Sequence, residues 1–470
     1  AGLDDAVAAA EGAGRLVVDG DRIYAAELYR CEVQLATDLG VLAARSRANP
    51  PAPAAEIEQA ERWLGVELDP SQRAAAASAL RPGVTVITGG PGTGKTTLVR
   101  VLLRALHERN AEVRLASPTG RAARRLEEAT GAAASTLHRL LEFDPSEGRF
   151  RKGIGEPLDT GAIVVDEASM VDVQLGCALL EASPLDDPRA SLVLVGDVDQ
   201  LPSVGPGQVL RDLIASDAIP VARLDTLHRQ AAGSGLIVAA REIQAGRVPV
   251  SGEASGASDV FLLDRRDPED AARTVVKVVS ERLADRGFDP RSDVQVLAPT
   301  RRGPLGTERL NLLLQGALNP ETRAITRGDR SFRVGDRVIC TRNRYDVEVF
   351  NGDIGRIQDL DERRLSIAFD GRTVEWDRDD LGMLDLAYAI TVHKSQGSEY
   401  PAVVVAMHDA HGIMLRRNLF YTACTRPKRF LCVVGSPDAW RRAVRSIGGD
   451  DRNTALAERL RDIRHPREGA

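Results

Sequence analysis

The sequence lacks the features that mark several classes of protein. No apolar run approaches the roughly 20 residues that cross a bilayer, so we expect no membrane span and no membrane partner. The five cysteines form no Cys-x-x-Cys pair, which disfavours a zinc site or a disulfide framework and fits a reducing cytoplasm. His408 and His411 have no completing ligand pattern, and we expect them in a solvated loop. The N-terminus has neither the basic segment of a secretory signal nor an initiator Met. These observations favour a cytoplasmic, N-terminally truncated chain.

Basic charge, lysine and aromatic residues are also scarce. The net charge is -6, so a polyanion would have to lie in a local groove. Only 4% of residues are aromatic, which leaves little for stacking on bases. Five of the 62 basic residues are lysines. Two of them, Lys95 and Lys394, stand in glycine-containing polar stretches after strand-like runs, where a compact point charge is useful.

A nucleotide-binding sequence lies in the first half of the chain. The segment GVTVITGGPGTGKTTLVRVLLRAL, residues 83–106, reads as a β-branched strand, a glycine-rich turn and an apolar-periodic helix. Within it the pattern G-x-x-x-x-G-K-[ST] begins at Gly89. In such a loop the backbone N–H groups hold phosphates, the lysine reaches the β/γ oxygens and the hydroxyl binds Mg²⁺. The residues expected to bind ATP and Mg²⁺ here are Gly90, Pro91, Gly92, Thr93, Gly94, Lys95, Thr96 and Thr97.

Further side chains fit the hydrolysis of a nucleoside triphosphate. A second strand-like run ends in Asp166 and Glu167. The first carboxylate suits a water-mediated hold on Mg²⁺, and the second suits polarising the attacking water. A third run leads to Gln200, which can sense the γ-phosphate. Upstream, Gln72 is placed to read adenine, or else it belongs to an ordinary helix start after an Asp-Pro pair.

A second set of α/β signals follows without a phosphate-binding loop of its own. It comprises the runs DVQVLAPTRRG (293–303), ITVHKSQGSEYPAVVV (390–405) and RFLCVVGSP (429–437). Arg301 and Arg426 lie at loop positions beside these runs. An arginine from a second lobe can complete a γ-phosphate site and make closure of a cleft depend on ATP. The sequence therefore predicts an α/β protein with two parallel-sheet domains.

The order of the motifs resembles that of superfamily-one DNA helicases. GGPGTGKTT, VVDEASM, LVGDVDQLPSVGPGQVL, LDTLHRQ, TVHKSQGSEY and FYTACTRPKR are most similar to the RecD-type, 5′→3′ branch. The resemblance runs from about residue 68 to residue 437. It implies two RecA-like lobes that grip single-stranded DNA and step as ATP is hydrolysed. The N-terminal segment resembles the longer, stand-alone RecD-like proteins, so we expect a monomer with no obligate RecBC partner.

The resemblance also assigns further site residues. Thr391, His393 and Lys394 would face a DNA phosphate, while Gln396 and Glu399 would reach the nucleotide, so that one loop touches both ligands. The implied catalytic residues are Lys95, Asp166, Glu167, Gln200, Arg229 and Arg426, and the implied further nucleotide contacts are Gln72, Gln396, Gly397 and Glu399. The implied nucleic-acid contacts are Pro118, Thr119, Arg121, His138, Arg301, Arg342, Arg344, Thr391, His393, Lys394 and Ser395.

Four parts make up the expected architecture. We expect a winged-helix-like fragment at 1–66, a first RecA-like domain at 67–225, a second at 226–325 and 384–470, and an SH3-like β-barrel insertion at 326–383. Residues 141–161 read as a β-hairpin insertion, which in this family splits the duplex; a plain surface hairpin is the alternative. For His138, the alternative to a DNA contact is a role in the core or in capping a helix. For Arg342 and Arg344, the alternative to DNA contacts is a solvated basic turn.

The expected activity is ATP-dependent 5′→3′ translocation on single-stranded DNA with unwinding at single-strand/double-strand junctions, in DNA repair or recombination. A translocase that does not unwind is the nearest alternative, and a strand-displacement assay separates the two. A P-loop remodeller or small-molecule kinase would gain support if single-stranded DNA failed to stimulate ATP hydrolysis. A non-catalytic DNA-binding module would leave Lys95, Asp166 and Glu167 without a purpose.

Overall fold

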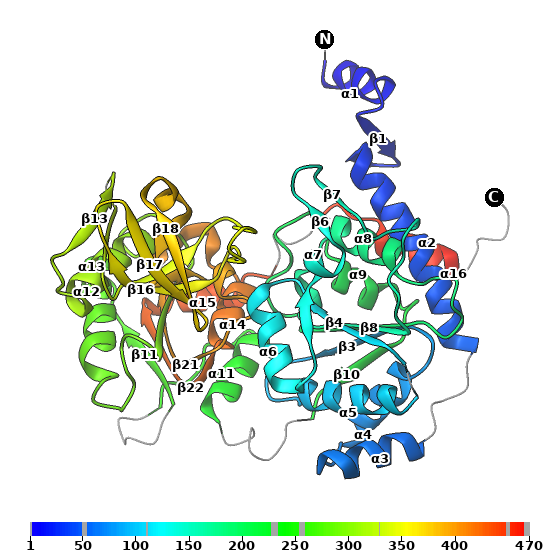
Figure 1. Ribbon diagram of the computed structural model, residues 1–470, viewed down its shortest axis with the longest axis horizontal. Helices are drawn as coiled ribbons and strands as arrows, with labels where there is room; N and C mark the ends of the chain where they lie inside the picture. The colour runs from blue at the N-terminus through cyan, green and yellow to red at the C-terminus, as the bar shows by residue number, and fades with distance from the viewer. Residues whose placement is uncertain are drawn as a thin grey trace. The chain divides into compact units, whose positions relative to one another are not determined.

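The chain folds into two compact units, each described separately (Figure 1). The computed structural model describes residues 2–48, 54–109, 111–226, 234–252, 259–328, 330–447 and 452–464. Unit 1 comprises Ala1–His228 with Gly449–Ala470, and unit 2 comprises Arg229–Gly448. Within the described ranges, none of the helices combines the length and the apolar character that a membrane crossing requires.

Unit 1 is built on a six-stranded parallel sheet with the order β10-β3-β9-β8-β4-β5. Its strands are β3 (Gly83–Gly89), β4 (Val113–Ser117), β5 (Ala134–Thr136), β8 (Ala162–Val165), β9 (Ser191–Gly196) and β10 (Val221–Leu224). The central strands β8 and β9 are buried along their whole length, as their continuous apolar runs predict for a sheet covered on both faces. The sequence-predicted parallel sheet is therefore confirmed.

Two helical layers cover this sheet, as Figure 1 shows. Alternate residues of β8 divide between them: Ala162 and Val164 pack in the core with the helices on one face, and Ile163 and Val165 with those on the other. The first layer contains α3 (Ala54–Leu64), α4 (Pro70–Ala79) and α5 (Lys95–Glu108); the second contains α2 (Ala26–Ala48), α8 (Val173–Ala182) and α9 (Val209–Ser216). Unit 1 also contains α6 (Gly120–Thr130), α7 (Leu137–Leu140) and the 3-10 turn η1 (Ala168–Met170).

The N-terminal residues form a helix, a hairpin and a second helix, and they belong to unit 1 and not to the expected separate fragment at 1–66. The elements are α1 (Leu3–Gly12), β1 (Leu16–Asp19), β2 (Arg22–Ala25) and α2. Leu35 and Leu39 of α2 are each 1% exposed in the core of unit 1. The Ser46 hydroxyl of α2 accepts a hydrogen bond from the N–H of Val84, at 2.9 Å. Helix α2 thus belongs to the second helical layer of unit 1.

The C-terminal residues correct another expected boundary, because the chain returns to unit 1. Helix α16 (Leu456–Arg464) packs beside α2 and α9 (Figure 1), not in the second α/β unit as predicted for residues 384–470. Leu456 and Leu460 are buried in the unit 1 core. Arg459 forms ion pairs with Asp19, at 2.6 Å, and with Glu32, at 3.2 Å. These apolar and ionic contacts hold the segment there.

Unit 2 combines a parallel sheet with an antiparallel barrel-like sheet. The parallel sheet has the order β11-β22-β21-β12-β20, with β11 (Val260–Asp264), β12 (Val294–Ala298), β20 (Ala389–Thr391), β21 (Tyr400–Met407) and β22 (Pro427–Gly435). The helical elements are α11 (Gly235–Gln244), α12 (Pro268–Lys277), η2 (Val278–Arg282), α13 (Thr307–Leu318), η4 (His393–Ser395), η5 (Asp409–Met414), α14 (Arg417–Cys424) and α15 (Pro437–Arg445).

The predicted insertion is observed as a five-stranded antiparallel sheet. It comprises β15 (Arg337–Cys340), β16 (Ile354–Leu360), β17 (Arg364–Phe369), β18 (Arg372–Asp377) and β19 (Leu384–Leu386), with the hairpin β13 (Ala324–Arg327) and β14 (Arg330–Arg333) before it and η3 (Arg378–Met383) before β19. The sequence stretches NGD (351–353), DER (361–363) and DG (370–371) lie in the connections between its strands. The buried carboxylate of Asp336 accepts hydrogen bonds from Gln315 of α13, from Asn319 directly after that helix and from Tyr388, at 2.6 to 2.8 Å. This network fixes the insertion on the parallel sheet.

Candidate nucleotide and nucleic-acid site

The predicted phosphate-binding loop connects β3 to α5. Gly92 and Gly94 have φ values of 75° and 74°, in the left-handed region that favours glycine. A Cβ on Gly89 would lie 2.8 Å from the Thr93 hydroxyl and 2.9 Å from the Leu224 carbonyl, so no larger residue fits. The Lys95 ammonium donates to the carbonyls of Gly89, at 2.5 Å, and Gly90, at 2.9 Å. The loop therefore combines a helix N-terminus with a nearby cation, the arrangement that binds phosphate.

Asp166 and Glu167 directly follow β8. The neighbouring strand β9 leads to the loop that carries Gln200. The Asp166 carboxylate accepts from the N–H of Glu167, at 2.9 Å, and Glu167 lies 4.0 Å from the guanidinium of Arg125. Burial and the adjacent charge of Glu167 raise the pKa of Asp166 to about 6, although Lys95 and Arg125 oppose the shift. The positive charges of Lys95 and Arg125 therefore compensate the negative charge of Asp166 only in part.

A divalent cation fits this part of unit 1. The hydroxyl-bearing Thr96 is exposed at the start of α5, and Asp166 has a carboxylate whose charge is poorly compensated. Mg²⁺ in phosphate-binding sites takes only one or two protein oxygens, together with phosphate oxygens and water. Thr96 and Asp166 supply that donor set.

The Asp166→Asn variant is expected to be more stable than the wild type at neutral pH without nucleotide or Mg²⁺. The folded-state pKa of about 6 exceeds the unfolded value of about 3.9, so ionisation of Asp166 destabilises the fold above pH 6, and this cost disappears as the pH falls toward 4. We expect a gain of about 1–2 kcal/mol at pH 7.5, after allowance for solvent screening, and none at pH 4. Urea unfolding at several pH values measures it. A gain independent of pH, or one also produced by Asn at the exposed Asp285, would contradict the explanation.

Gln200 and Gln72 both lie close to the phosphate-binding strand. Gln200 is 8% exposed, and its amide donates to the carboxylate of the buried Asp197, at 3.4 Å. Gln72 is 1% exposed; its amide oxygen accepts from the N–H of Asp69, at 3.0 Å, and its amide nitrogen donates to the carbonyl of Thr93, at 3.1 Å. Gln72 therefore completes the capping box of α4 and contacts the phosphate-binding loop at the same time. Asp197 was not among the predicted site residues, although it stands in the same motif as Gln200.

The remaining predicted residues of unit 1 lie after β4 and around the hairpin. Pro118, Thr119 and Arg121 are half-buried at the start of α6, where the Thr119 hydroxyl accepts from the N–H of Ala122, at 3.3 Å. The exposed His138 packs its ring against two phenylalanines of the hairpin β6 (Phe143–Asp144) and β7 (Arg149–Phe150), with ring centroids 5.5 and 5.6 Å away. His138 thus supports the hairpin. Arg229 lies outside the described residues.

In unit 2, the loop after β20 carries the predicted residues Thr391 to Glu399. Ser395 and Gln396 are buried, and Gly397 has a φ of 71°. The Lys394 ammonium lies 3.9 Å from the carboxylate of Asp385. Burial of the ammonium lowers the pKa of Lys394, against the opposing effect of Asp385. His393 and Glu399 take part in further contacts, including an ion pair of Glu399 with Lys428 at 3.9 Å.

Arg426 is joined to the same loop. Its side chain is only 3% exposed, and it donates to the carbonyl of Thr422, at 3.0 Å, and to the carbonyl of Ser398, at 3.2 Å. The Arg426 carbonyl accepts from the N–H of Tyr400, at 3.0 Å. The structure therefore brings together the predicted arginine and the loop that carries Gln396.

The predicted arginines of the insertion differ from one another. Arg342 is exposed. Arg344 forms ion pairs with Asp346, at 2.7 Å, and Asp380, at 2.6 Å, and lies 4.9 Å over the ring of Trp376. These contacts fix Arg344 in the barrel, and its predicted phosphate contact stays a prediction.

The prediction that His408 and His411 lie in a solvated loop is wrong. They are 6% and 4% exposed. His408 Nε2 lies 2.8 Å from the carbonyl of Arg266, and the His408 N–H donates to Nδ1 of His411, at 3.1 Å. Burial lowers the pKa of His411 to about 4. The pair connects the end of β21 to neighbouring backbone, which no local sequence pattern indicates.

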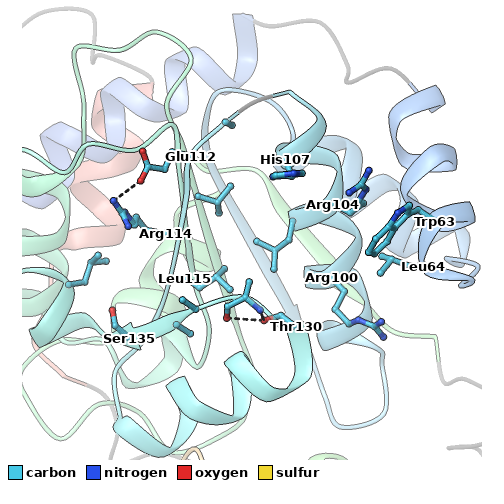
Figure 2. A pocket seen from close by; sticks show the side chains of 17 residues that line it. Trp63, Leu64, Arg100, Arg104, His107, Glu112, Arg114, Leu115, Thr130 and Ser135 are labelled. Carbon is cyan, nitrogen blue, oxygen red and sulfur yellow. Dashed lines mark hydrogen bonds and ion pairs between the residues drawn. The ribbon is translucent and has the colours of Figure 1, made fainter. Parts of the chain in front are cut away.

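A cavity of about 680 Å³ lies along the other half of α5 (Figure 2). Its wall includes Arg100 and His107 of α5 and Trp63 of α3, with the Arg104 guanidinium 4.5 Å over the Trp63 ring. Glu112 and Arg114 form an ion pair at its edge, at 2.6 Å. Among the described residues, its lining includes none that the sequence predicts for the site. The predicted nucleotide site is therefore distinct from this cavity.

Comparisons with known proteins match three segments of the chain. Residues 67–259 match an AAA domain family, residues 310–369 the SH3 domain of ATP-dependent RecD-like DNA helicases, and residues 386–434 the UvrD-like helicase C-terminal domain. A solved structure of Pif1 helicases in DNA unwinding at forked duplex DNA has a TM-score of 0.51, with 18% identity over 82% of this chain and 94% of that one. This structural similarity confirms the fold of two RecA-like cores.

Curated relatives cover nearly the whole chain. It is 39% identical to the ATP-dependent RecD2 DNA helicase of Deinococcus radiodurans, over 97% of this chain and 60% of that protein's length. It is 35% identical to the RecBCD enzyme subunit RecD of Mycolicibacterium smegmatis, over 94% of this chain and 83% of that protein. This chain therefore belongs to the RecD-like family of ATP-dependent DNA helicases.

Proposed function

We propose that this protein is an ATP-driven motor that moves 5′→3′ along single-stranded DNA and separates duplex at single-strand/double-strand junctions. Support for an ATP-dependent DNA helicase comes from the family. The direction rests on the resemblance of the sequence motifs to the RecD-type, 5′→3′ branch. We further propose a monomer that needs no RecBC partner and acts in DNA repair or recombination. The higher identity to a RecD2 helicase (39%) than to a RecD subunit of the RecBCD enzyme (35%) supports the absence of a RecBC partner.

In the proposal, unit 1 carries out hydrolysis. Lys95 contacts the β- and γ-phosphates, the loop residues Gly90 to Thr97 hold them through backbone N–H groups, and Glu167 orients and polarises the attacking water. Water adds to the γ-phosphorus, the bond to the β–γ bridging oxygen breaks, and ADP and inorganic phosphate leave. Mg²⁺ held by Thr96 and Asp166 would neutralise phosphate charge. Gln200 would sense the γ-phosphate, and Gln72 would contact the base.

The loop of residues 391–399 in unit 2 is proposed to couple the nucleotide to the DNA. One observation carries this proposal: Arg426 donates to the carbonyl of Ser398, while Lys394, four residues earlier in the loop, lines a cavity together with Arg301 and Arg330. Arg426 and Arg229 would contact the γ-phosphate, and Gln396, Gly397 and Glu399 the nucleotide. A change at the nucleotide end would then move the residues that hold the strand.

The proposed DNA contacts are phosphate contacts, which do not depend on sequence. Thr391, His393, Lys394, Ser395 and Arg301 would supply them in unit 2, with Arg342 as an exposed addition. In unit 1, the proposed contacts are Pro118, Thr119 and Arg121. We assign His138 to support of the hairpin, because its ring packs on Phe143 and Phe150.

Unwinding of tailed duplexes tests the proposed function. With ATP and Mg²⁺, we expect strand separation from a duplex with a 5′ single-stranded tail and little or none from one with a 3′ tail. Separation from the 3′ tail would contradict the direction. ATP hydrolysis stimulated by single-stranded DNA without separation of either duplex would favour the translocase that does not unwind.

The hairpin favours unwinding over translocation alone. Phe143 and Phe150 pack against each other, with ring centroids 5.0 Å apart, and both contact His138. At the base of the hairpin, Asp144 pairs with Arg151, at 2.8 Å. These ring contacts and the ion pair stabilise the conformation of the hairpin. A strand-separating element needs such a conformation when it contacts the end of a duplex.

A further inference from the structure

A cavity of about 410 Å³ in unit 2 gathers cations from three separate segments. Arg301 comes from the loop after β12, Arg330 begins β14, and Lys394 lies in η4. Thr391 also lines the cavity, and so do the carboxylate residues Asp385 and Glu308. Arg330 and Asp385 have no role in the proposed function. We call this cavity the Asp385 pocket.

All three cations converge on the Asp385 carboxylate. Arg330 donates to it at 2.8 Å, and nitrogen atoms of Arg301 and Lys394 lie 3.6 and 3.9 Å from it. The Asp385 side chain is 22% exposed and that of Lys394 29%, so solvent screens their attraction only in part. The two arginines are more open, at 57% and 46%. The carboxylate therefore lies deeper in the pocket than the arginine side chains.

The backbone fixes the carboxylate in this position. Asp385 lies in β19 and pairs with Ile339 of β15. The side chain of Asn311 donates to the carbonyls of Leu386, at 3.0 Å, and Ala389, at 2.8 Å, on either side of the short link from β19 to β20. These backbone contacts hold Asp385 at a fixed distance from Lys394. A DNA strand that enters the pocket therefore finds the carboxylate already positioned beside the cations.

A carboxylate and a phosphodiester present the same recognition chemistry. Each carries one negative charge over two acceptor oxygens, and each pairs with arginine and lysine in the same way. Resting on the proposed DNA-binding function, we propose that Asp385 competes with the backbone phosphates of the DNA strand for Arg301, Arg330 and Lys394. Asp385 thereby limits the grip of unit 2 on the strand, and Arg330 is a further phosphate contact.

The competition has a direct consequence for movement along DNA. A motor must release each phosphate as well as bind it, and without Asp385 the cations of the pocket would hold a strand more tightly. Arg301 alone would keep a second carboxylate partner, Glu308 at 3.5 Å. Asp385 remains beside the cations when a phosphate leaves, so the exchange of one anion for another lowers the cost of release. A strand bound in the pocket also experiences repulsion from the carboxylate at short range.

The Asp385→Asn variant tests the proposal, because it removes the charge and keeps an oxygen that can accept from Arg330. We expect a fluorescent oligo-dT strand to bind about three- to tenfold more tightly than to the wild type at low salt, mainly through slower dissociation. Arg330→Ala should weaken binding and make its salt dependence shallower by about one counterion. In the double variant, the gain from Asp385→Asn should shrink, because Arg330 makes the shortest contact with that carboxylate.

Asp377→Asn is the matched control. It makes the same change in the same insertion, at a residue with 67% exposure that pairs with Arg364, at 3.2 Å, outside the pocket. Equal tightening in both variants would reveal a general charge effect and overturn the proposal, as would unchanged or weaker binding by a folded Asp385→Asn protein. If the wild type fails to bind single-stranded DNA, the proposed function itself falls, and this inference with it.

Discussion

Replacing Lys95 with Ala is expected to reduce ATP hydrolysis by about a hundredfold or more. In the structure the ammonium lies against the carbonyls of Gly89 and Gly90, at the mouth of the phosphate-binding loop. A fixed cation in that position offsets the charge that develops on the β- and γ-phosphates in the transition state. Steady-state phosphate release with saturating ATP and single-stranded DNA measures the effect. Unwinding should fall in parallel, because it depends on hydrolysis.

Lys277→Ala provides a matched control for this loss. Lys277 is another of the five lysines, it is exposed at the end of α12, and the proposal assigns it no part in hydrolysis. The control should hydrolyse ATP at the wild-type rate. Full activity in Lys95→Ala would show that the loop is not the catalytic nucleotide site, whatever its geometry.

Replacing Glu167 with Gln is expected to separate binding from chemistry. Gln retains the size and the hydrogen-bonding oxygen of Glu167, but it removes the charge that polarises water. We therefore expect the hydrolysis rate to fall by about a thousandfold, while a fluorescent ATP analogue binds within about threefold of the wild-type affinity. Stopped-flow binding and single-turnover hydrolysis measure the two quantities separately.

Glu128→Gln is the corresponding control, since Glu128 is an exposed glutamate of α6 close in sequence to Arg125. It should leave both quantities unchanged. If Glu167→Gln hydrolysed ATP as the wild type does, another group would have to activate the water. If the variant lost nucleotide affinity instead, the carboxylate would act in binding.

The contrast between the two variants follows from their positions. Lys95 lies at the start of α5. In the proposed function it contacts the phosphates in both the ground state and the transition state. Glu167 has a φ of 53° just after β8, a conformation that is costly for a residue other than glycine. Its carboxylate lies 4.0 Å from the guanidinium of Arg125. The structure thus supports different roles for the two residues.

Much of the fold could be predicted from the sequence because the signals are local. The buried parallel strands appear as continuous apolar runs, and the phosphate-binding loop must follow the first of them. The turns of the insertion appear as Gly and Asp at fixed positions. For the same reason, the sequence placed Asp166 and Glu167 at a strand end, and the structure has them directly after β8.

Other features depend on contacts between distant residues and have no local signal. Helix α16 packs on α2 through Leu456 and Leu460, more than 400 residues later in the chain. Arg344 resembles a free basic residue in the sequence, but two carboxylates and Trp376 engage it. Asp385 lies next to the predicted coupling loop without belonging to any motif. Long-range ion pairs of this kind require coordinates.

Stimulation of ATP hydrolysis by single-stranded DNA tests the central claim most directly. In the proposed mechanism, one loop, from Thr391 to Glu399, connects the groups that hold the strand with Arg426. We therefore expect a saturating oligonucleotide to raise the steady-state hydrolysis rate of the wild type by at least about tenfold. Equal rates with and without the oligonucleotide, in a protein that binds both ligands, would contradict it.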